Sequence, residues 1–261
     1  MMKKLAIPIF CILAVGIVIF GKMHYDNKLA SIKENASNHQ LLDSNVSKVM
    51  DKELLELTNN MNNELRDLFI RKFESEETLS ILVIGSDATF TSEDDDLPWP
   101  FQFIEAIEEN YVGAYFHLET MNLEDISTHQ LIETNAHYQA ASFQPDVMIV
   151  EPLLLNDNGI VKIDDTIQNI NILLDTVKES SPEVFILLQP PNPIFQATVY
   201  LEQVNYLKEF ALTNRYEYLD HWEAWPEVTD EQLQRVLTGI YPNTIGHELW
   251  AGYINDYFVA K

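Results

Sequence analysis

Residues 81–89, "ILVIGSDAT", decide the fold of this chain. Four apolar residues run up to Gly85, and the polar pair Ser86 and Asp87 follows at once. A continuous apolar run that stops at a glycine is typical of a strand buried on both faces of a parallel sheet. Open parallel sheets bind their ligands beyond the carboxyl ends of their strands. The stretch therefore predicts a parallel sheet with Ser86 and Asp87 at its ligand-binding edge.

The rest of the chain repeats this pattern to its end. Short apolar runs predict strands over residues 79–85, 112–119, 145–155, 183–191 and 216–222. Stretches with helical spacing of apolar residues predict helices over residues 97–111, 127–143, 165–181, 198–215 and 243–261. Apolar strands that alternate with helices predict an α/β fold, a three-layer α/β/α sandwich around a parallel five-stranded sheet.

Two segments precede this predicted domain of residues 78–261. Lys3 and Lys4 come before an uncharged apolar run from Leu5 to Gly21, which predicts a signal-anchor over residues 1–21 with the C-terminal domain outside the cell membrane. A cleaved secretory signal is the alternative, and it leads to the same exported location. Apolar residues at helical spacing predict a helical stalk over residues 22–77, with its last turns packed on the domain.

The charge and the cysteine count exclude several function classes. The chain has 16 Lys and Arg against 41 Asp and Glu, a net charge of −25, so it repels nucleic acid. The sequence contains neither G-x-x-x-x-G-K nor G-x-G-x-x-G, the two glycine-rich motifs that bind nucleotide phosphates, so we expect no nucleotide ligand. Cys11 is the single cysteine, which excludes a disulfide framework and a cysteine-based zinc site. We therefore expect neither cofactor nor metal.

Three short blocks resemble the SGNH/GDSL hydrolase family. They are residues 85–89 after the first strand, Asn156 and Asp157 after the third, and the Pro-Asn-x-x-Gly-His pattern at residues 242–247 before the last helix. The resemblance covers residues 78–261 and implies a flavodoxin-like sheet. It also implies acyl-ester hydrolysis on lipids or surface glycans, with a serine nucleophile, an oxyanion hole, and an acid and a base before the last helix.

The family's catalytic positions hold other residues in this sequence. Asp87 stands where the family has its serine, and Ser86 lies one place earlier. The positions of the acid and the base read Thr238 and Tyr241. A carboxylate that attacks an ester gives a labile anhydride, and a tyrosine with a pKa of about 10 is a poor base at neutral pH. The standard mechanism therefore cannot use its standard positions.

Two hypotheses follow. In the first, the protein is an esterase that uses Ser86 with His221 or His247 as base, and Asn156 with the Asp87 N–H as oxyanion hole. In the second, it is a non-catalytic surface binding or scaffolding module that retains the pocket. The membrane and an acylated glycan or lipid are the expected partners in both.

Plain structural roles compete with each of these assignments. Asp87 and Ser86 also suit a helix start or a turn, and Asn156 also suits a turn. His247 shares one side of the last predicted helix with Trp250 and Tyr253, an arrangement typical of core packing.

Overall fold

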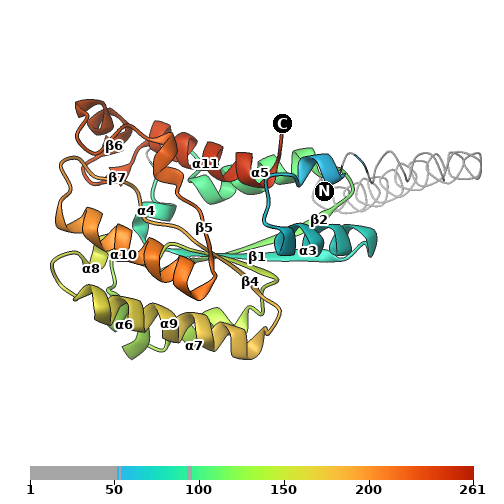
Figure 1. The fold of residues 1–261 in the computed structure, drawn as a ribbon, viewed down its shortest axis with the longest axis horizontal. Helices are drawn as coiled ribbons and strands as arrows, with labels where there is room; N and C mark the ends of the chain where they lie inside the picture. Colours follow the sequence, from blue (N-terminus) through green and yellow to red (C-terminus); the bar gives the residue numbers. More distant parts are fainter. Residues whose placement is uncertain (1–51, 53, 93–95) are drawn as a thin grey trace, which may run out of the picture. The chain divides into compact units, whose positions relative to one another are not determined.

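The computed structural model describes residue 52 and residues 54–92 and 96–261 (Figure 1). The predicted signal-anchor at residues 1–21 and the first part of the predicted stalk lie outside these residues. Within the described part of the chain, no helix is long and apolar enough to cross a bilayer. Membrane attachment and the location outside the membrane therefore stay predictions.

A parallel sheet of five strands forms the centre of the domain, in the order β2-β1-β3-β4-β5. The strands are β1 (Thr78–Gly85), β2 (Tyr115–Asn122), β3 (Val147–Val150), β4 (Phe185–Leu188) and β5 (Glu217–Tyr218). Every residue of β3 and β4 is buried, as expected of strands covered on both faces.

Helices cover both faces of this sheet and complete the three layers (Figure 1). One face packs against α3 (Asn63–Glu74), α5 (Trp99–Asn110) and α11 (Thr244–Phe258). The other packs against α6 (Thr128–Glu133), α7 (Ala136–Ser142), α9 (Ile163–Ser180) and α10 (Val199–Asn214). The residues of β1 point alternately into the two hydrophobic cores, one on each face of the sheet. Ile81 and Val83 lie in the first core, and Leu82 and Ile84 lie in the second. The predicted α/β/α architecture is confirmed.

Short elements complete the carboxyl end of the sheet. They are α4 (Asp87–Phe90), α8 (Leu154–Asp157), the 3-10 helices η1 (His221–Ala224) and η2 (Glu231–Val236), and the antiparallel pair β6 (Leu237–Thr238) and β7 (Tyr241–Pro242).

Three predicted elements differ from the observed ones. The strand expected over residues 145–155 ends at Val150, and Leu154 and Leu155 lie in the helix α8. The helix expected over residues 127–143 is two helices, α6 and α7, because Asn135 between them adopts a left-handed conformation with φ of 62°. The strand expected over residues 216–222 pairs only at Glu217 and Tyr218, and the chain enters η1 at His221.

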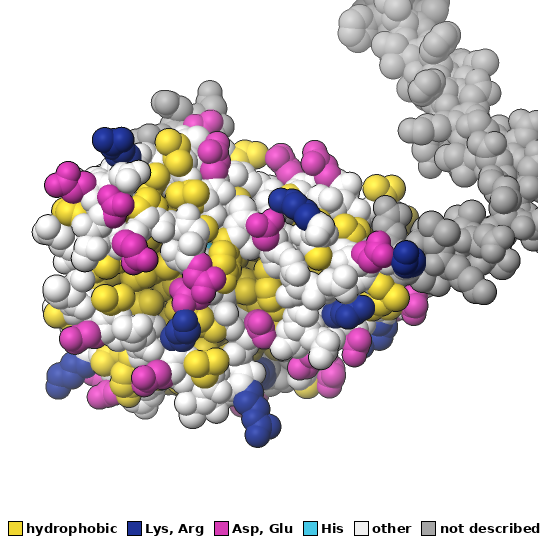
Figure 2. All heavy atoms as spheres, turned by 45° about the horizontal axis from the view of Figure 1, so that its top comes forward, with side chains coloured by type: hydrophobic (Ala, Val, Ile, Leu, Met, Phe, Trp, Pro, Cys, Tyr) yellow, Lys and Arg dark blue, Asp and Glu magenta, His cyan; other side chains and the backbone are white. Residues whose placement is uncertain are grey.

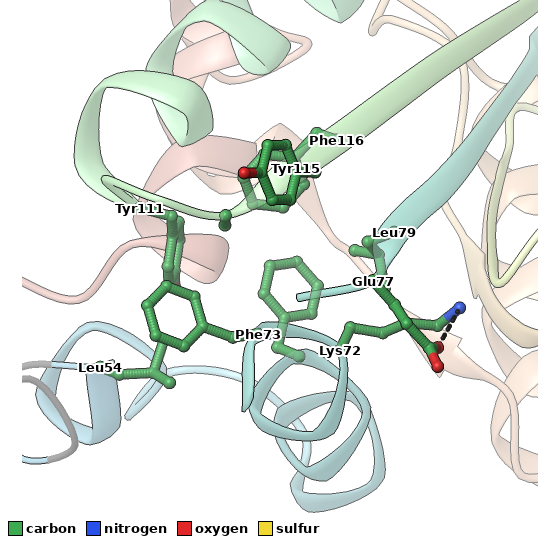
Figure 3. Close-up of a pocket in the computed structure, with 10 residues that line it drawn as sticks. Leu54, Lys72, Phe73, Glu77, Leu79, Tyr111, Tyr115 and Phe116 are labelled. Atoms are coloured by element: carbon green, nitrogen blue, oxygen red, sulfur yellow. Dashed lines mark ion pairs between the residues drawn. The ribbon is translucent and has the colours of Figure 1, made fainter. Parts of the chain in front are cut away.

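The last turns of the predicted stalk pack on the domain. Leu65, Leu68 and Phe69 of α3 are buried in the first core, and residues 54–261 form one compact unit. Figure 3 shows Phe73 and Lys72 of α3 beside the start of β1 and β2, where Lys72 pairs with Glu77 at 3.5 Å. The pocket between them measures about 10 Å³ and lies at the amino end of the strands, so it has room for a water molecule rather than an organic ligand.

Candidate functional site

The turn from β1 into α4 places Ser86 and Asp87 at the carboxyl edge of the sheet. A Cβ at Gly85 would lie 2.3 Å from Thr89 Oγ1 and 3.2 Å from Glu151 Cβ. The turn can therefore be this tight only because residue 85 has no side chain. Ser86 is the N-cap of α4, and Asp87 is the first helical residue.

Ser86 is wholly buried at this turn. Its Oγ donates to Glu151 Oε2 at 2.5 Å and accepts from the Ala88 N–H at 3.2 Å. Its backbone N–H also donates to Glu151 Oε2, at 2.7 Å. The hydroxyl thus caps a helix and binds a carboxylate, while no part of the residue reaches the surface.

Glu151 is a site residue that the sequence analysis missed. It follows the last residue of β3, is wholly buried, and joins the ends of β1 and β3 through its contacts with Ser86. Its Oε1 also accepts from the Leu153 N–H at 2.8 Å. Burial raises the pKa of Glu151, and the hydrogen bonds from Ser86 and Leu153 oppose this rise. The sequence contains one indication of this role, which is the position of an acidic residue at the end of an apolar run.

Asp87, Tyr241 and Asn122, which ends β2, lie near one another at the same edge, and we call this group of three side chains the mouth. Asn122 Nδ2 donates to Asp87 Oδ1 at 3.2 Å. Burial raises the pKa of Tyr241, and the negative charges of Asp87 and Asp125 raise it further. Tyr241 therefore keeps its proton at neutral pH and can donate a hydrogen bond at this mouth.

Both predicted oxyanion donors bind a carbonyl of the chain itself. The Asp87 N–H donates to the Glu124 carbonyl at 3.2 Å, and Asn156 Nδ2 donates to the same oxygen at 3.0 Å. Asn156 Nδ2 also donates to the Ile126 carbonyl at 2.9 Å. Glu124 adopts a left-handed conformation with φ of 52°, in the turn after β2. The Glu124 carbonyl thus occupies the place that an oxyanion would need.

Asp157, next to Asn156, lies in the interior. It is wholly buried, and its carboxylate accepts from the Thr128 N–H at 2.9 Å and from the Thr166 hydroxyl at 2.6 Å. These contacts join the starts of α6 and α9 to α8. Asp157 therefore holds helices together and does not line the mouth.

The two candidate histidines are buried and bind other partners. His247 Nδ1 accepts from the Trp99 N–H at 3.3 Å, and its Nε2 lies 2.8 Å from the Thr91 carbonyl. His221 Nε2 lies 2.8 Å from the Pro190 carbonyl, and its Nδ1 accepts from Trp225 Nε1 at 3.0 Å.

Burial lowers the pKa of both histidines, that of His221 to about 3. Both rings are therefore neutral at physiological pH, with each ring nitrogen bonded to a group other than Ser86 or Asp87. The structure thus brings Ser86, Asp87, Asn156 and Tyr241 to one edge of the sheet, whereas His247 contacts the loop before α5. Within the described residues, no group of three or more His, Cys, Asp or Glu side chains is arranged to hold a metal ion.

No protein-family model and no curated protein matches this chain. Solved structures do resemble it. A protein described as a GDSL-like lipase from Parabacteroides merdae is 14% identical with a TM-score of 0.58, over 69% of this chain and 95% of that one. An acetylxylan esterase from Geobacillus stearothermophilus is 13% identical with a TM-score of 0.57, over 69% and 94%. A two-domain esterase active on acetylated mannans is 19% identical with a TM-score of 0.61, over 76% of this chain and 53% of that one.

Proposed function

This chain has an SGNH/GDSL hydrolase-like fold, and we propose that it works as a non-catalytic module that binds an acylated glycan at the carboxyl edge of its sheet. In this proposal residues 1–21 anchor the domain outside the cell membrane. The observation that carries the proposal is the Glu124 carbonyl, which accepts hydrogen bonds from both the Asp87 N–H and the Asn156 amide. An acyl-transfer site needs these donors free for the oxyanion of its transition state.

The surroundings of Ser86 support the same conclusion. A serine nucleophile must reach the substrate carbonyl and must pass its proton to a base. Ser86 is wholly buried, and its hydroxyl donates to Glu151. Its contacts are those of an N-cap and of a link between two strands, which are structural roles.

The nature of the edge supports a glycan as the ligand. Asp87 and Tyr241 offer a carboxylate acceptor and a protonated phenol donor for sugar hydroxyls, whereas the Asn122 amide is bonded to Asp87 Oδ1 and to the Glu124 N–H. Figure 2 shows hydrophobic side chains gathered in a hollow among acidic ones, at the end of the domain where Figure 1 places α4, β6 and β7. Two of the similar structures are described as an acetylxylan esterase and as an esterase active on acetylated mannans, and the second was co-crystallised with mannopentaose.

One contact favours a second candidate, ester hydrolysis. Ser86 Oγ lies 2.5 Å from Glu151 Oε2, and burial raises the pKa of Glu151, which makes its carboxylate a stronger base. In this candidate Ser86 Oγ bonds to the acyl carbon and Glu151 takes the serine proton. The ester C–O bond then breaks, and Glu151 returns this proton to the sugar oxygen that leaves as a hydroxyl. The Glu124 carbonyl must then leave the Asp87 N–H and the Asn156 amide before an ester can bind.

Binding and hydrolysis of an acetylated xylo-oligosaccharide distinguish the two candidates. We expect the full chain to bind this ligand in calorimetry and to release no acetate above the rate of buffer. Tyr241→Phe removes one hydrogen bond at the mouth and should raise Kd roughly two- to tenfold. Tyr115→Phe, at an exposed tyrosine at the start of β2, is the matched control and should leave Kd unchanged.

Two outcomes would contradict the binding module. Acetate release by the wild-type chain that disappears in Ser86→Ala establishes the esterase instead. An equal Kd for Tyr241→Phe and for the wild-type chain would show that the ligand binds elsewhere than at this edge.

A further inference from the structure

The outer edge of β2 has no strand beside it among the residues that the structure describes. β2 is the last strand on its side of the sheet and pairs with β1 over its whole length, in a register that runs without a break. Its sequence, YFHLETMN, contains no proline and no lysine, the residues that commonly protect a sheet edge. β5 at the opposite edge is two residues long. β2 is therefore the edge that can accept a further strand.

The backbone of β2 presents a row of donors and acceptors at this edge. The Leu123 N–H, just after β2, donates to the Gly85 carbonyl of β1 at 2.8 Å. Backbone groups alternate in direction along a strand, so those of Phe116, Leu118 and Thr120 point away from β1. No hydrogen bond from another described residue reaches these outward groups.

A second copy of β2, laid antiparallel to the first, matches these groups residue by residue. With a two-fold axis at Leu118, the outward groups of Leu118 meet those of Leu118 in the second copy, and Phe116 meets Thr120. The two residues of each such pair exchange both of their backbone hydrogen bonds. The outward groups then all have partners, and the two sheets become one continuous sheet.

The side chains are complementary in the same register. His117 of each copy lies opposite Glu119 of the other, at a position without backbone hydrogen bonds, where side chains approach most closely. These side chains are 60% and 42% exposed, and His117 Nε2 already lies 2.8 Å from Glu119 Oε1 within one chain. An axis at Phe116 or Thr120 would lose both pairs between the copies. The axis at Leu118 is therefore favoured.

We propose that two copies of this chain join through their β2 edges, antiparallel and with the axis at Leu118. The dimer has a closed two-fold symmetry, so it does not grow into a fibre. An interface made by one pair of strands is small, and we expect its Kd in roughly the micromolar to millimolar range. The proposal does not depend on the ligand of the mouth.

Sedimentation velocity of the full chain, over about 1 μM to 1 mM, should show a monomer that dimerises as the concentration rises. His117→Glu places carboxylates opposite each other, and Glu119→His places imidazoles opposite each other. Each variant should raise the dimer Kd roughly three- to thirtyfold, because two complementary pairs are lost. His129→Glu, at an exposed histidine of α6, is the matched control and should leave this Kd unchanged.

A mixture of the two variants separates a lost interface from a lost fold. His117→Glu supplies two carboxylates and Glu119→His supplies two imidazoles, so both pairs of the mixed dimer are complementary again. We expect the mixture to dimerise with a Kd near that of the wild-type chain, although each variant alone dimerises poorly.

Cysteine cross-linking tests the register. Cys11 is the single cysteine, so the variants are made in a Cys11→Ser background. Leu118→Cys should form a disulfide-linked dimer under mild oxidation, because the two copies of residue 118 face each other across the axis. Tyr115 is more exposed, at 57%, but its two copies lie about 20 Å apart in this register. Tyr115→Cys is therefore the control that should not cross-link.

Four results would overturn the proposal. The first is a wild-type chain that stays monomeric up to about 1 mM. The second is an equal dimer Kd for His117→Glu and the wild-type chain, which would place the contact on another surface. The third is a mixture of the two variants that stays monomeric although circular dichroism shows both to be folded. The fourth is a Tyr115→Cys chain that cross-links as readily as Leu118→Cys.

Discussion

Ser86→Ala removes one buried hydroxyl that makes two hydrogen bonds. Ser86 Oγ donates to the Glu151 carboxyl group at 2.5 Å and accepts from the Ala88 N–H as the N-cap of α4. A hydrogen bond to a charged group contributes about 1.5–3 kcal/mol, and an N-cap contributes about 1 kcal/mol. Because Glu151 stays buried and loses its shortest partner, we expect the free energy of unfolding to fall by about 2–4 kcal/mol.

Urea unfolding followed by tryptophan fluorescence measures this loss. Ser127→Ala is the matched control, because Ser127 is the N-cap of α6 and binds Gln130 but has no buried carboxylate partner. It should cost about 1 kcal/mol. If Ser86→Ala is as stable as the wild-type chain and has lost an ester hydrolysis that the wild-type chain performs, then the structural role argued for Ser86 is refuted.

Two further predictions concern buried histidines and the turn after β1. Burial lowers the pKa of His221 from 6.5 to about 3 in the folded state and lowers that of His247 too, so the unfolded chain binds more protons between these values. The free energy of unfolding should therefore fall as the pH drops below 6.5. In urea titrations at several pH values, the double variant His221→Gln/His247→Gln should show a weaker dependence of this free energy on pH. A pH dependence equal to that of the wild-type chain would contradict the lowered pKa values of the two histidines. Gly85→Ala places a Cβ 2.3 Å from Thr89 Oγ1 and should lower the free energy of unfolding in urea by about 1–3 kcal/mol. Gly252→Ala, inside α11 and with nothing within 4 Å of the added Cβ, should raise it by about 0.5–1 kcal/mol, because alanine favours the helix. Equal stabilities of the two glycine variants would show that the turn relaxes.

The central sheet was predictable because burial on both faces leaves a clear pattern. Residues 79–85 and 183–191 are apolar runs, and the structure places β1 and β4 within them. The predictions were wrong where tertiary contacts determine the bounds of an element. Asn135 breaks a continuous helical pattern by adopting a left-handed conformation, and β5 pairs with β4 only at Glu217 and Tyr218 before the chain enters η1.

The candidate site was predictable in position but not in its contacts. The rule that ligands bind beyond the carboxyl ends of parallel strands directed attention to Ser86, Asp87 and Asn156, and the structure places all three there. It did not identify Glu151, because the partner of this carboxylate is Ser86, 65 residues earlier in the chain. Nor does the sequence indicate that the Glu124 carbonyl points at the Asp87 N–H.

The amino-acid sequence alone therefore determines the alternation of strands and helices, the parallel sheet and the edge at which polar residues gather, since hydrophobic periodicity is a local property. Tertiary structure alone decides that Ser86 is buried against Glu151 and that a backbone carbonyl fills the place of an oxyanion. Such contacts depend on the directions of backbone groups that are brought together from separate strands, and residue types do not encode these directions.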